Sequence, residues 1–493
     1  MEGKALLRQF KVDILQQLPK THELFFKWFL ALTEVKRPSY ECGPAMAIVT
    51  EWFHKLGATS KIDQAGNSIF AIPATPGKEA VKPLCIQGHL DIVSVGEFED
   101  GKVQIKIENG CLTSGISTIG ADDGVAIATM LAIAESASTF EHGKLEFLVT
   151  VDEEVGLLGA TKLAGPPFME SRAMLNLDAE EWGEFISSCA GGMNIFFEHE
   201  CKCEAFEGRV LELNLKDFVS GHTGICIHEG RQNAVKWMVR MLLEAKRRGE
   251  EFRLISIAGG DKHNAIPGVC KCQVVVKTEK FEQILNEVHG LILHEVKVIE
   301  KKVPKLVITP IQKTVEPLVK QDSEKVLNLI NTIYHGVWVL HPEIKGLVQT
   351  SQSLSITKFE GNTLKIQVFA RSNEGSMMEW LLNTNQAVAD LAGVKIHIPA
   401  DEIVGPWPAA MQSRITDISR NVYESLFGQQ PTINGIHAGL ECGAIQNRGY
   451  GDLEAIAFGP TIHGAHTTEE TVSIDTACKC YDLTLEIVKK WAQ

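Results

Sequence analysis

Apolar runs that read as buried strands alternate with helical stretches through the first 192 residues of the chain. The runs are KPLCIQGHLDIV from Lys82, KLEFLVTVDEE from Lys144 and AMLNLD from Ala173, and the helical stretch GVAIATMLAIAES lies between the first two. Alternation of this kind indicates an α/β layer with a largely parallel sheet. We therefore predict an α/β fold for this part of the chain.

The pattern changes in the middle of the chain and then returns. From 193 to 404, strands such as RVLELNLKD alternate with period two and are interleaved with helices such as NAVKWMVRMLLEAKRR. Such strands face solvent on one side of a sheet. A chain of 493 residues also exceeds the roughly 250–300 residues at which single cores stop growing. We predict a first domain made of residues 1–192 and 405–493, with an α+β domain of residues 193–404 inserted into it.

Composition excludes several classes of partner. The net charge of −14 and the pI of about 5.6 argue against nucleic acid, which needs clustered Lys and Arg. The first residues are charged throughout, unlike a signal peptide, and no segment reaches the roughly 18 apolar residues of a membrane span. The twelve cysteines are expected as thiols, and the three C-x-C pairs are interpreted as structural residues rather than zinc ligands, because C-x₂₋₄-C is the usual chelating spacing. We expect a cytoplasmic protein with no membrane partner.

Five segments carry a histidine or a carboxylate where a strand is expected to end. They contain His89 and Asp91, Asp122 and Asp123, Glu153 and Glu154, Asp178, and His463 and His466. Ligands in α/β domains bind at the carboxyl ends of the strands, because the loops there converge on one crevice. We therefore expect these side chains to meet at one metal site.

The spacing within the segments suggests individual roles. Asp91 follows His89 by two residues on the same face of an extended chain, so it could accept the second ring N–H and fix the tautomer. Two imidazoles and three carboxylates exceed one tetrahedral zinc but suit two ions that share a carboxylate and a hydroxide. Glu153 and Glu154 point in different directions, so one can bind metal while the other takes a proton. The sequence predicts a hydrolytic centre.

Eight segments together resemble the aminoacyl-histidine dipeptidases (Xaa-His dipeptidase, peptidase D). These enzymes belong to the di-zinc family that also contains carnosinase and the carboxypeptidase G-like enzymes. The segments span Leu84 to Glu470 and read GHLDIV, GADDGVAIA, DEEVGLLGA, NLDAEEWGEFISSCAGG, SGHTGICIHEGRQNA, HNAIPG, IHAGLECGAI and GPTIHGAHTTEE. The resemblance implies a di-zinc aminopeptidase-like catalytic domain with an inserted lid domain.

The resemblance also implies roles at the metal centre. Asp122 bridges two divalent ions, with His89 and Asp178 on one ion and Glu154 and His466 on the other. Glu153 is the general base, Asp91 stands behind His89, and the peptide bond between Asp122 and Asp123 is cis. Zinc is the expected metal, with manganese or cobalt as alternatives.

In the inserted domain, the resemblance implies groups that bind the substrate. His222 would stabilise the oxyanion, and Asn233, Asn264 and Arg371 are candidates for holding the terminal carboxylate. The motif around His222 departs from the family pattern at Ser220 and Thr223, which could alter the loop that presents the imidazole. No role follows from the sequence for His263, His437, Glu441 and His463.

The expected activity is hydrolysis of Xaa-His and related dipeptides, with little activity on tripeptides. One alternative is a deacylase of N-acyl amino acids with the same metals and base. A second is an inactive binding relative, which the complete ligand set disfavours. A homodimer is expected by resemblance alone.

Overall fold

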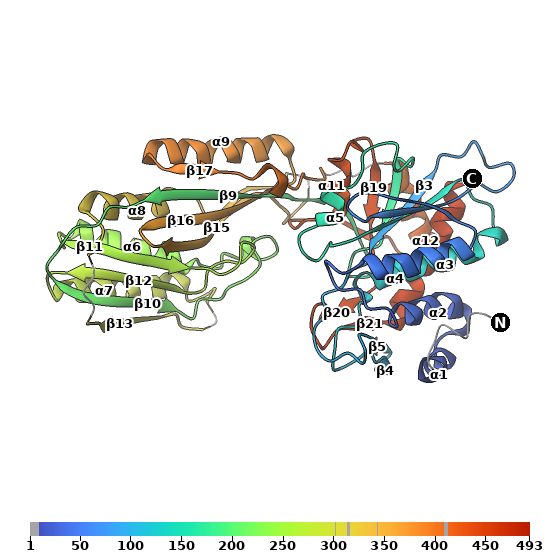
Figure 1. The fold of residues 1–493 in the computed structure, drawn as a ribbon, viewed down its shortest axis with the longest axis horizontal. Helices are drawn as coiled ribbons and strands as arrows, with labels where there is room; N and C mark the ends of the chain where they lie inside the picture. Colours follow the sequence, from blue (N-terminus) through green and yellow to red (C-terminus); the bar gives the residue numbers. More distant parts are fainter. Residues whose placement is uncertain (1–8, 301, 313–315, 343, 409–412) are drawn as a thin grey trace. The chain divides into compact units, whose positions relative to one another are not determined.

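The computed structural model describes residues 9–300, 302–312, 316–342, 344–408 and 413–493 (Figure 1). Contacts divide the chain into two compact units. Unit 1 comprises Met1–Cys189, Trp407–Gly435 and Gly439–Gln493, and unit 2 comprises Ala190–Pro406 and Ile436–Ala438. The sequence pattern had placed the inserted domain at 193–404 and gave no sign of the short return at 436–438. No helix in the described ranges combines the length and apolarity that crossing a membrane requires.

Unit 1 is built around a mixed sheet that has eight strands among the described residues. Their order is β1 (Thr59–Ile62), β2 (Ser68–Ile72), β6 (Leu145–Thr150), β3 (Leu84–His89), β7 (Ala173–Asn176), β19 (Glu454–Ala457), β8 (Glu184–Cys189) and β18 (Thr432–Ile436). The four central strands, β6, β3, β7 and β19, pair in parallel. Every residue of β3 and β6 is buried, so both faces of the sheet centre are covered. The predicted parallel layer is confirmed.

Helices and a small second sheet complete unit 1. The helices are α1 (Gln9–Gln17), α2 (Glu23–Leu32), α3 (Gly43–Lys55), α4 (Ala121–Ser136), α5 (Leu158–Thr161), α10 (Arg414–Phe427), α11 (Glu441–Gln446) and α12 (Ile474–Trp491). The second sheet has the order β20 (Ile462–His463), β21 (Thr471–Ser473), β5 (Cys111–Thr113) and β4 (Lys106–Glu108).

Helix α4 lies close to strand β3, which ends at His89. A Cβ atom at Gly88 would stand 2.3 Å from Asp123 Oδ2 and 2.4 Å from Ala126 Cβ. Only glycine fits there, because any side chain would push the helix off the strand. The residue before His89 therefore fixes how near the start of α4 comes to the end of β3.

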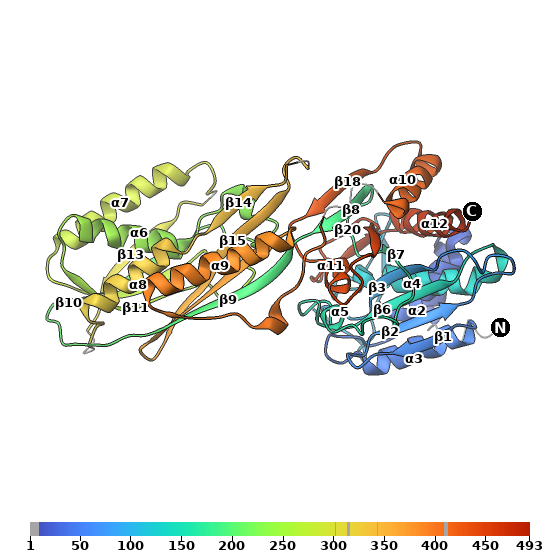
Figure 2. The ribbon, with the colours of Figure 1, turned by 90° about the horizontal axis from the view of Figure 1, so that it is seen from above.

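Unit 2 is an antiparallel sheet with helices against it. The strands run β13 (Lys305–Pro310), β10 (Arg209–Lys216), β12 (Cys270–Val276), β11 (Phe252–Gly259), β15 (Val348–Glu360), β16 (Thr363–Ser372), β9 (Gly191–Glu200) and β17 (Lys395–His397), and β14 (Gly336–Leu340) pairs with β15. The helices are α6 (Ala234–Arg247), α7 (Lys280–Val296), α8 (Lys320–Thr332) and α9 (Gly375–Ala392). Helices α6, α8 and α9 lie in a row (Figure 2).

The predicted period-two alternation is visible in the burial of unit 2. In β10, Leu211, Leu213 and Leu215 are buried and belong to the core shared with the helices, whereas the residues between them are partly exposed. One face of the strand therefore packs on the helices and the other faces water, as its polar residues require. The C-x-C pair on β12 is buried on the same core face.

Candidate functional site

Three neighbouring parallel strands of unit 1 deliver side chains to one edge of its sheet. His89 is the last residue of β3, Glu153 and Glu154 follow β6, and Asp178 follows β7. Because β6, β3 and β7 are adjacent and parallel, their carboxyl ends meet at this edge. The ends of these three strands therefore lie side by side, and the metal-binding roles of their side chains stay a prediction.

Asp122 and His466 arrive by other routes. Asp122 lies in the first turn of α4 rather than at a strand end, and its backbone angles are not helical. The peptide bond from Asp122 to Asp123 is cis, as the resemblance implied. His466 lies in the loop after β20 with a φ of 63°, in the left-handed region. Irregular backbone at these two points aims both side chains at the end of β3.

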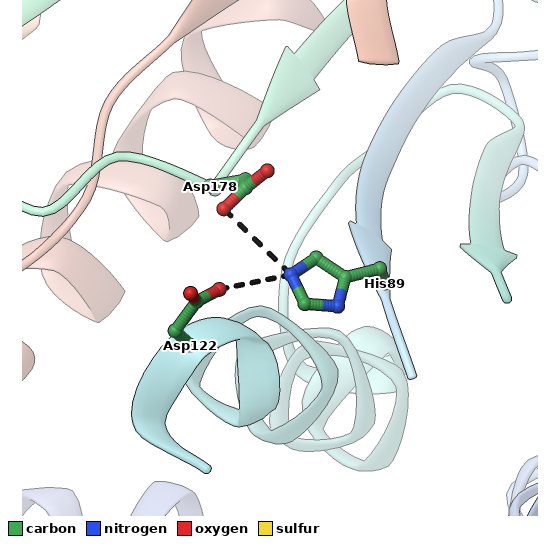
Figure 3. Close-up of side chains that lie close together, drawn as sticks. All are labelled: His89, Asp122 and Asp178. Atoms are coloured by element: carbon green, nitrogen blue, oxygen red, sulfur yellow. Dashed lines mark hydrogen bonds and ion pairs between the residues drawn. The ribbon is translucent and has the colours of Figure 1, made fainter. Parts of the chain in front are cut away.

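The imidazole of His89 faces two carboxylates across the edge of the sheet (Figure 3). Its Nε2 atom lies 2.8 Å from Asp122 Oδ1 and 3.8 Å from Asp178 Oδ1. The same nitrogen is 4.0 Å from Glu153 Oε2. One ring nitrogen is thus surrounded by three carboxyl groups.

His466 meets the other side of the same aspartate. Its Nε2 atom lies 3.0 Å from Asp122 Oδ2 and 2.9 Å from Glu154 Oε2. The two oxygens of Asp122 therefore point to two different imidazoles, one on His89 and one on His466. A carboxylate held in this way can serve two ligand sets at once.

The donor set fits two divalent cations. Ligand atoms within 4.8 Å of one another occur in three groups: His89 with Asp122 and Asp178, His89 with Glu153 and Glu154, and Asp122 with Glu154 and His466. Glu154 Oε1 is buried and has no hydrogen-bond partner among the described residues. A buried carboxylate oxygen without a donor is costly, and a cation would remove that cost. Imidazole and carboxylate ligands suit zinc, and carboxylates also suit manganese.

The histidines and the carboxylates of the site change each other's protonation. Hydrogen bonds to Asp122 and Glu154 raise the pKa of His466 to about 11. Burial alone would lower the pKa of His89, but hydrogen bonds to Asp122 and Asp91 raise it well above its ordinary value. Burial likewise opposes ionisation of Asp122, yet hydrogen bonds from both histidines hold its pKa below the ordinary value. Asp122 is therefore a carboxylate at neutral pH.

Asp91 holds the loop that carries the two glutamates. Its carboxylate accepts hydrogen bonds from the backbone N–H of Glu153 at 3.0 Å and of Glu154 at 3.2 Å, and from Ser39 Oγ at 2.8 Å. The Nδ1 atom of His89 lies 3.0 Å from the Asp91 backbone carbonyl but 3.6 Å from its carboxylate. The ring is thus oriented chiefly by the Asp91 carbonyl, and the carboxylate mainly fixes the glutamate loop.

Glu441, for which no role follows from the sequence, lies in a buried network next to the site. Its Oε2 atom accepts hydrogen bonds from Gln87 Nε2 at 2.5 Å and from Thr150 Oγ1 at 2.7 Å. Gln87 Oε1 in turn accepts a hydrogen bond from Asn176 Nδ2 at 2.6 Å. Burial raises the pKa of Glu441 to about 7. The polar residues of β3, β6 and β7 that break their apolar runs were the available signal.

Two further residues of unit 1 differ in environment. Asp123, one of the side chains expected at the metal site, is buried, and its Oδ2 accepts a hydrogen bond from the backbone N–H of His89 at 3.3 Å. Burial, followed by the charge of Asp178, raises its pKa well above the ordinary value. His463 is exposed at the end of β20 and does not belong to any of the three ligand groups.

In unit 2, a second group forms around Arg371 at the end of β16. Its guanidinium lies 4.5 Å from the centre of the Phe369 ring, and its Nη2 atom is 3.3 Å from His222 Nε2. His222 Nδ1 accepts hydrogen bonds from the backbone N–H of Gly224 and Ile225, both at 3.2 Å. The two Nδ1 contacts place the proton of neutral His222 on Nε2, whereas a hydrogen bond from Arg371 needs an unprotonated Nε2, so the two sets of contacts exclude each other.

His437 lies in the same group through the short return of unit 2. Its Nε2 atom is 2.7 Å from Ser351 Oγ. Burial, followed by the charge of Arg371, lowers the pKa of His437 to about 3, and the same two causes lower that of His222 to about 4. Both imidazoles are thus neutral beside a permanent cation. Such a group suits an anionic ligand.

The asparagines predicted to hold a carboxylate have different surroundings. Asn233 caps helix α6 by accepting the backbone N–H of Val235 and Lys236, and its Nδ2 donates to the Leu354 carbonyl at 2.7 Å. It is 2% exposed, so the structure does not support a substrate contact for Asn233.

Asn264, the second of these asparagines, and its neighbour His263 lie next to the Arg371 group. The backbone carbonyl of Asn264 accepts a hydrogen bond from Thr223, the residue after His222, at 2.8 Å. His263 packs edge-on against Phe369 with ring centres 5.0 Å apart.

Comparisons with known proteins give a consistent result. Residues 85–490 match the family described as "Peptidase family M20/M25/M40". The chain is 30% identical over 475 residues to the cytosol non-specific dipeptidase of Escherichia coli (strain K12), covering 94% of this chain and 96% of that protein. It also resembles the solved structure of aminoacylhistidine dipeptidase from Vibrio alginolyticus, with a TM-score of 0.86, 28% identity, and coverage of 97% and 98%. Human carnosine dipeptidase 1 shares the fold at a TM-score of 0.51 and 11% identity, covering 98% of this chain and 100% of that one.

Proposed function

Because the chain belongs to peptidase family M20/M25/M40, we propose that it is a metal-dependent dipeptidase that hydrolyses Xaa-His and related dipeptides. The observation that carries the proposal is the position of Asp122, whose two oxygens lie 2.8 Å and 3.0 Å from the imidazoles of His89 and His466. The E. coli relative is named a non-specific dipeptidase and the Vibrio relative an aminoacylhistidine dipeptidase. Dipeptides are common to both names.

We propose that the chain holds two divalent cations, with zinc first and manganese or cobalt as alternatives. One set of ligands is His89, Asp122 and Asp178, and the other is Asp122, Glu154 and His466. When bound, such ions lower the pKa of water and polarise the scissile carbonyl. Asp122 belongs to both sets and fixes the relation between them.

Glu153 is proposed as the group that takes and returns the proton. Burial raises the pKa of Glu153 well above its ordinary value, so its carboxyl can both accept a proton and hold it at neutral pH. Its backbone N–H is fixed by the Asp91 carboxylate. Glu153 Oε2 would carry the proton from the attacking water to the leaving amine.

The group around Arg371 is proposed to bind the carboxyl end of the substrate. A guanidinium can hold a carboxylate through two parallel hydrogen bonds. Once Arg371 turns to that carboxylate, neutral His222 with its proton on Nε2 can donate to a developing oxyanion. A tripeptide would offer an amide where Arg371 requires a carboxylate. This mismatch predicts the preference for dipeptides.

The test is an activity panel on the purified chain. Xaa-His dipeptides, other dipeptides, tripeptides and acetylated amino acids are assayed after chelation and after return of zinc, manganese or cobalt. We expect dipeptides to be cut, tripeptides to be cut slowly, and activity to return only with metal. Preferential cleavage of acetylated amino acids would favour a deacylase and overturn the proposal.

A variant of the base tests the same mechanism. Glu153→Gln should lose several orders of magnitude in kcat while it binds metal as the wild type does. Near-normal turnover would remove Glu153 from the role. The cytoplasm is proposed as the location because the E. coli relative is named a cytosol enzyme, and the homodimer stays a prediction.

A further inference from the structure

The turn that precedes Asp122 is held by a single buried carboxylate. Glu470 Oε2 accepts hydrogen bonds from the backbone N–H of Ile119 at 2.7 Å and of Gly120 at 3.2 Å. Its Oε1 atom accepts from Ala121 at 2.8 Å. Glu470 is 2% exposed, so water cannot replace these bonds. Three consecutive N–H groups before the bridging aspartate therefore depend on one side chain.

A buried guanidinium holds the same turn through its carbonyl. Arg37 Nη2 donates to the Gly120 carbonyl and Nη1 donates to the Leu90 carbonyl, both at 2.7 Å. Leu90 follows His89 directly, and Arg37 is 2% exposed. One planar group thus ties the strand end that carries His89 to the turn that carries Asp122.

The fit between the guanidinium and the turn leaves no room for adjustment. Gly120 has a φ of 66°, and a Cβ atom there would lie 2.5 Å from Arg37 Nη2 and 2.7 Å from Ile92 Cγ2. Glycine is required both by the left-handed backbone and by the close approach. Arg37 and Ile92 therefore pack directly against the backbone of the turn.

Glu470 also links the turn to the second histidine. It lies in the same loop as His466, and its backbone carbonyl accepts a hydrogen bond from Thr113 Oγ1 at 2.8 Å. Since the side chain of Glu470 holds residues 119–121, the loop of His466 and the turn of Asp122 cannot move apart without breaking those bonds. Glu470 thereby supports the 3.0 Å contact between His466 and Asp122.

We propose that Arg37 and Glu470 are positioning residues that hold the Gly120 turn so that Asp122 can serve both metal ligand sets. Neither belongs to a ligand group, and Arg37 lies before residue 85, where the family match begins. The inference rests on the proposed function in one respect, which is that Asp122 binds cations. Loss of either side chain would leave buried backbone groups unpaired and let the turn shift.

The test measures ion binding to the full-length chain. The purified protein is stripped of metal and titrated calorimetrically with Zn²⁺ or Mn²⁺, without substrate. Glu470→Gln keeps the shape but loses one acceptor and the charge, and Arg37→Lys keeps the charge but cannot reach both carbonyls. Each should weaken ion binding by about 10- to 100-fold, the usual effect of removing a group that orients a ligand.

Matched controls separate this effect from general loss of charge or of a buried arginine. Glu469 is exposed beside Glu470, so Glu469→Gln should bind ions as the wild type does. Arg253 is a buried arginine of unit 2, so Arg253→Lys should also leave binding unchanged. The double variant Arg37→Lys with Glu470→Gln should lose less than the product of the two single losses, because both side chains hold the same turn.

Wild-type ion affinity in both single variants would overturn the inference, as would equal losses in the controls. If Glu470→Gln fails to fold, Glu470→Asp keeps the charge on a shorter arm and must meet the same expectation, and Arg37→Lys tests the proposal separately. Ion binding is measured without peptide, so an error in the dipeptide assignment would leave these results unchanged and would be found by the activity panel alone.

Discussion

Replacing Glu441 by glutamine should change how the stability of unit 1 depends on pH. The carboxyl is fully buried, and burial raises its pKa to about 7 from an ordinary 4.5. Between these pH values the unfolded chain releases the proton while the folded chain keeps it, so stability falls as pH rises. Each pH unit is worth about 1.4 kcal/mol, so the loss attributable to Glu441 is about 3 kcal/mol and is complete above about pH 7. Glu441→Gln should not show this loss.

The measurement is hydrogen exchange of strands β3 and β6 in the presence of a chelator, at pH 5 and pH 8, corrected for the intrinsic exchange rate. These strands belong to unit 1 and carry Gln87 and Thr150, the hydrogen-bond partners of Glu441. Glutamine adds an amide donor that lowers the free energy of unfolding by the same amount at both pH values. This amount cancels when the change in stability between pH 5 and pH 8 is compared. Glu469→Gln, an exposed carboxylate, is the control. Equal pH dependence in Glu441→Gln and the wild type would refute the reasoning.

Two predictions concern the group around Arg371. Arg371→Ala should raise KM for dipeptides by about 10- to 100-fold, because a charged hydrogen bond contributes about 1.5–3 kcal/mol. His222→Ala should mainly lower kcat, by about 10²- to 10³-fold. Steady-state kinetics measures KM and kcat separately, and the same change in both variants would contradict the assigned roles. Because burial lowers the pKa of His222 to about 4, its ring should stay neutral down to about pH 5 in NMR spectra of labelled histidine. Its contribution to stability should fall as pH drops from about 6.5 towards 4, since only the unfolded chain then binds the proton; protonation near pH 6.5 would contradict the stated environment.

The strand-end ligands could be predicted because one sequence feature, a polar residue at the end of an apolar run, indicates both the end of a strand and a candidate ligand. A parallel strand that is buried on both faces reads as an apolar run, and a polar residue where the run stops is placed at the common edge of the sheet. His89, Glu153, Glu154 and Asp178 all followed this rule. Asp122 did not, because it reaches the same place from the first turn of α4 through a non-helical backbone. The sequence pattern placed Asp122 at the site by treating it as a strand-end residue, and its role in both ligand sets came only from the resemblance.

Local rules were available for some of the errors. Asn233 precedes the helical run that begins at Ala234, and asparagine there is a strong signal for a helix cap. Asp123 was expected among the side chains of the metal site, yet Gly88 marks the point where α4 approaches β3 and encloses that carboxylate. In both cases the residue was judged by its charge or polarity and not by the backbone that it supports.

The contacts that hold the ligands in place leave little trace in sequence for a physical reason. Glu470 and Arg37 bind the N–H and carbonyl groups of the turn before Asp122, and every residue except proline supplies both groups whatever its side chain. The residues that receive such bonds are therefore not constrained in type. Gly120 is the exception, because the guanidinium occupies the space of its missing Cβ. A glycine two residues before a metal ligand therefore indicates that a supporting side chain packs closely against that segment. It does not identify the residue that supplies this side chain.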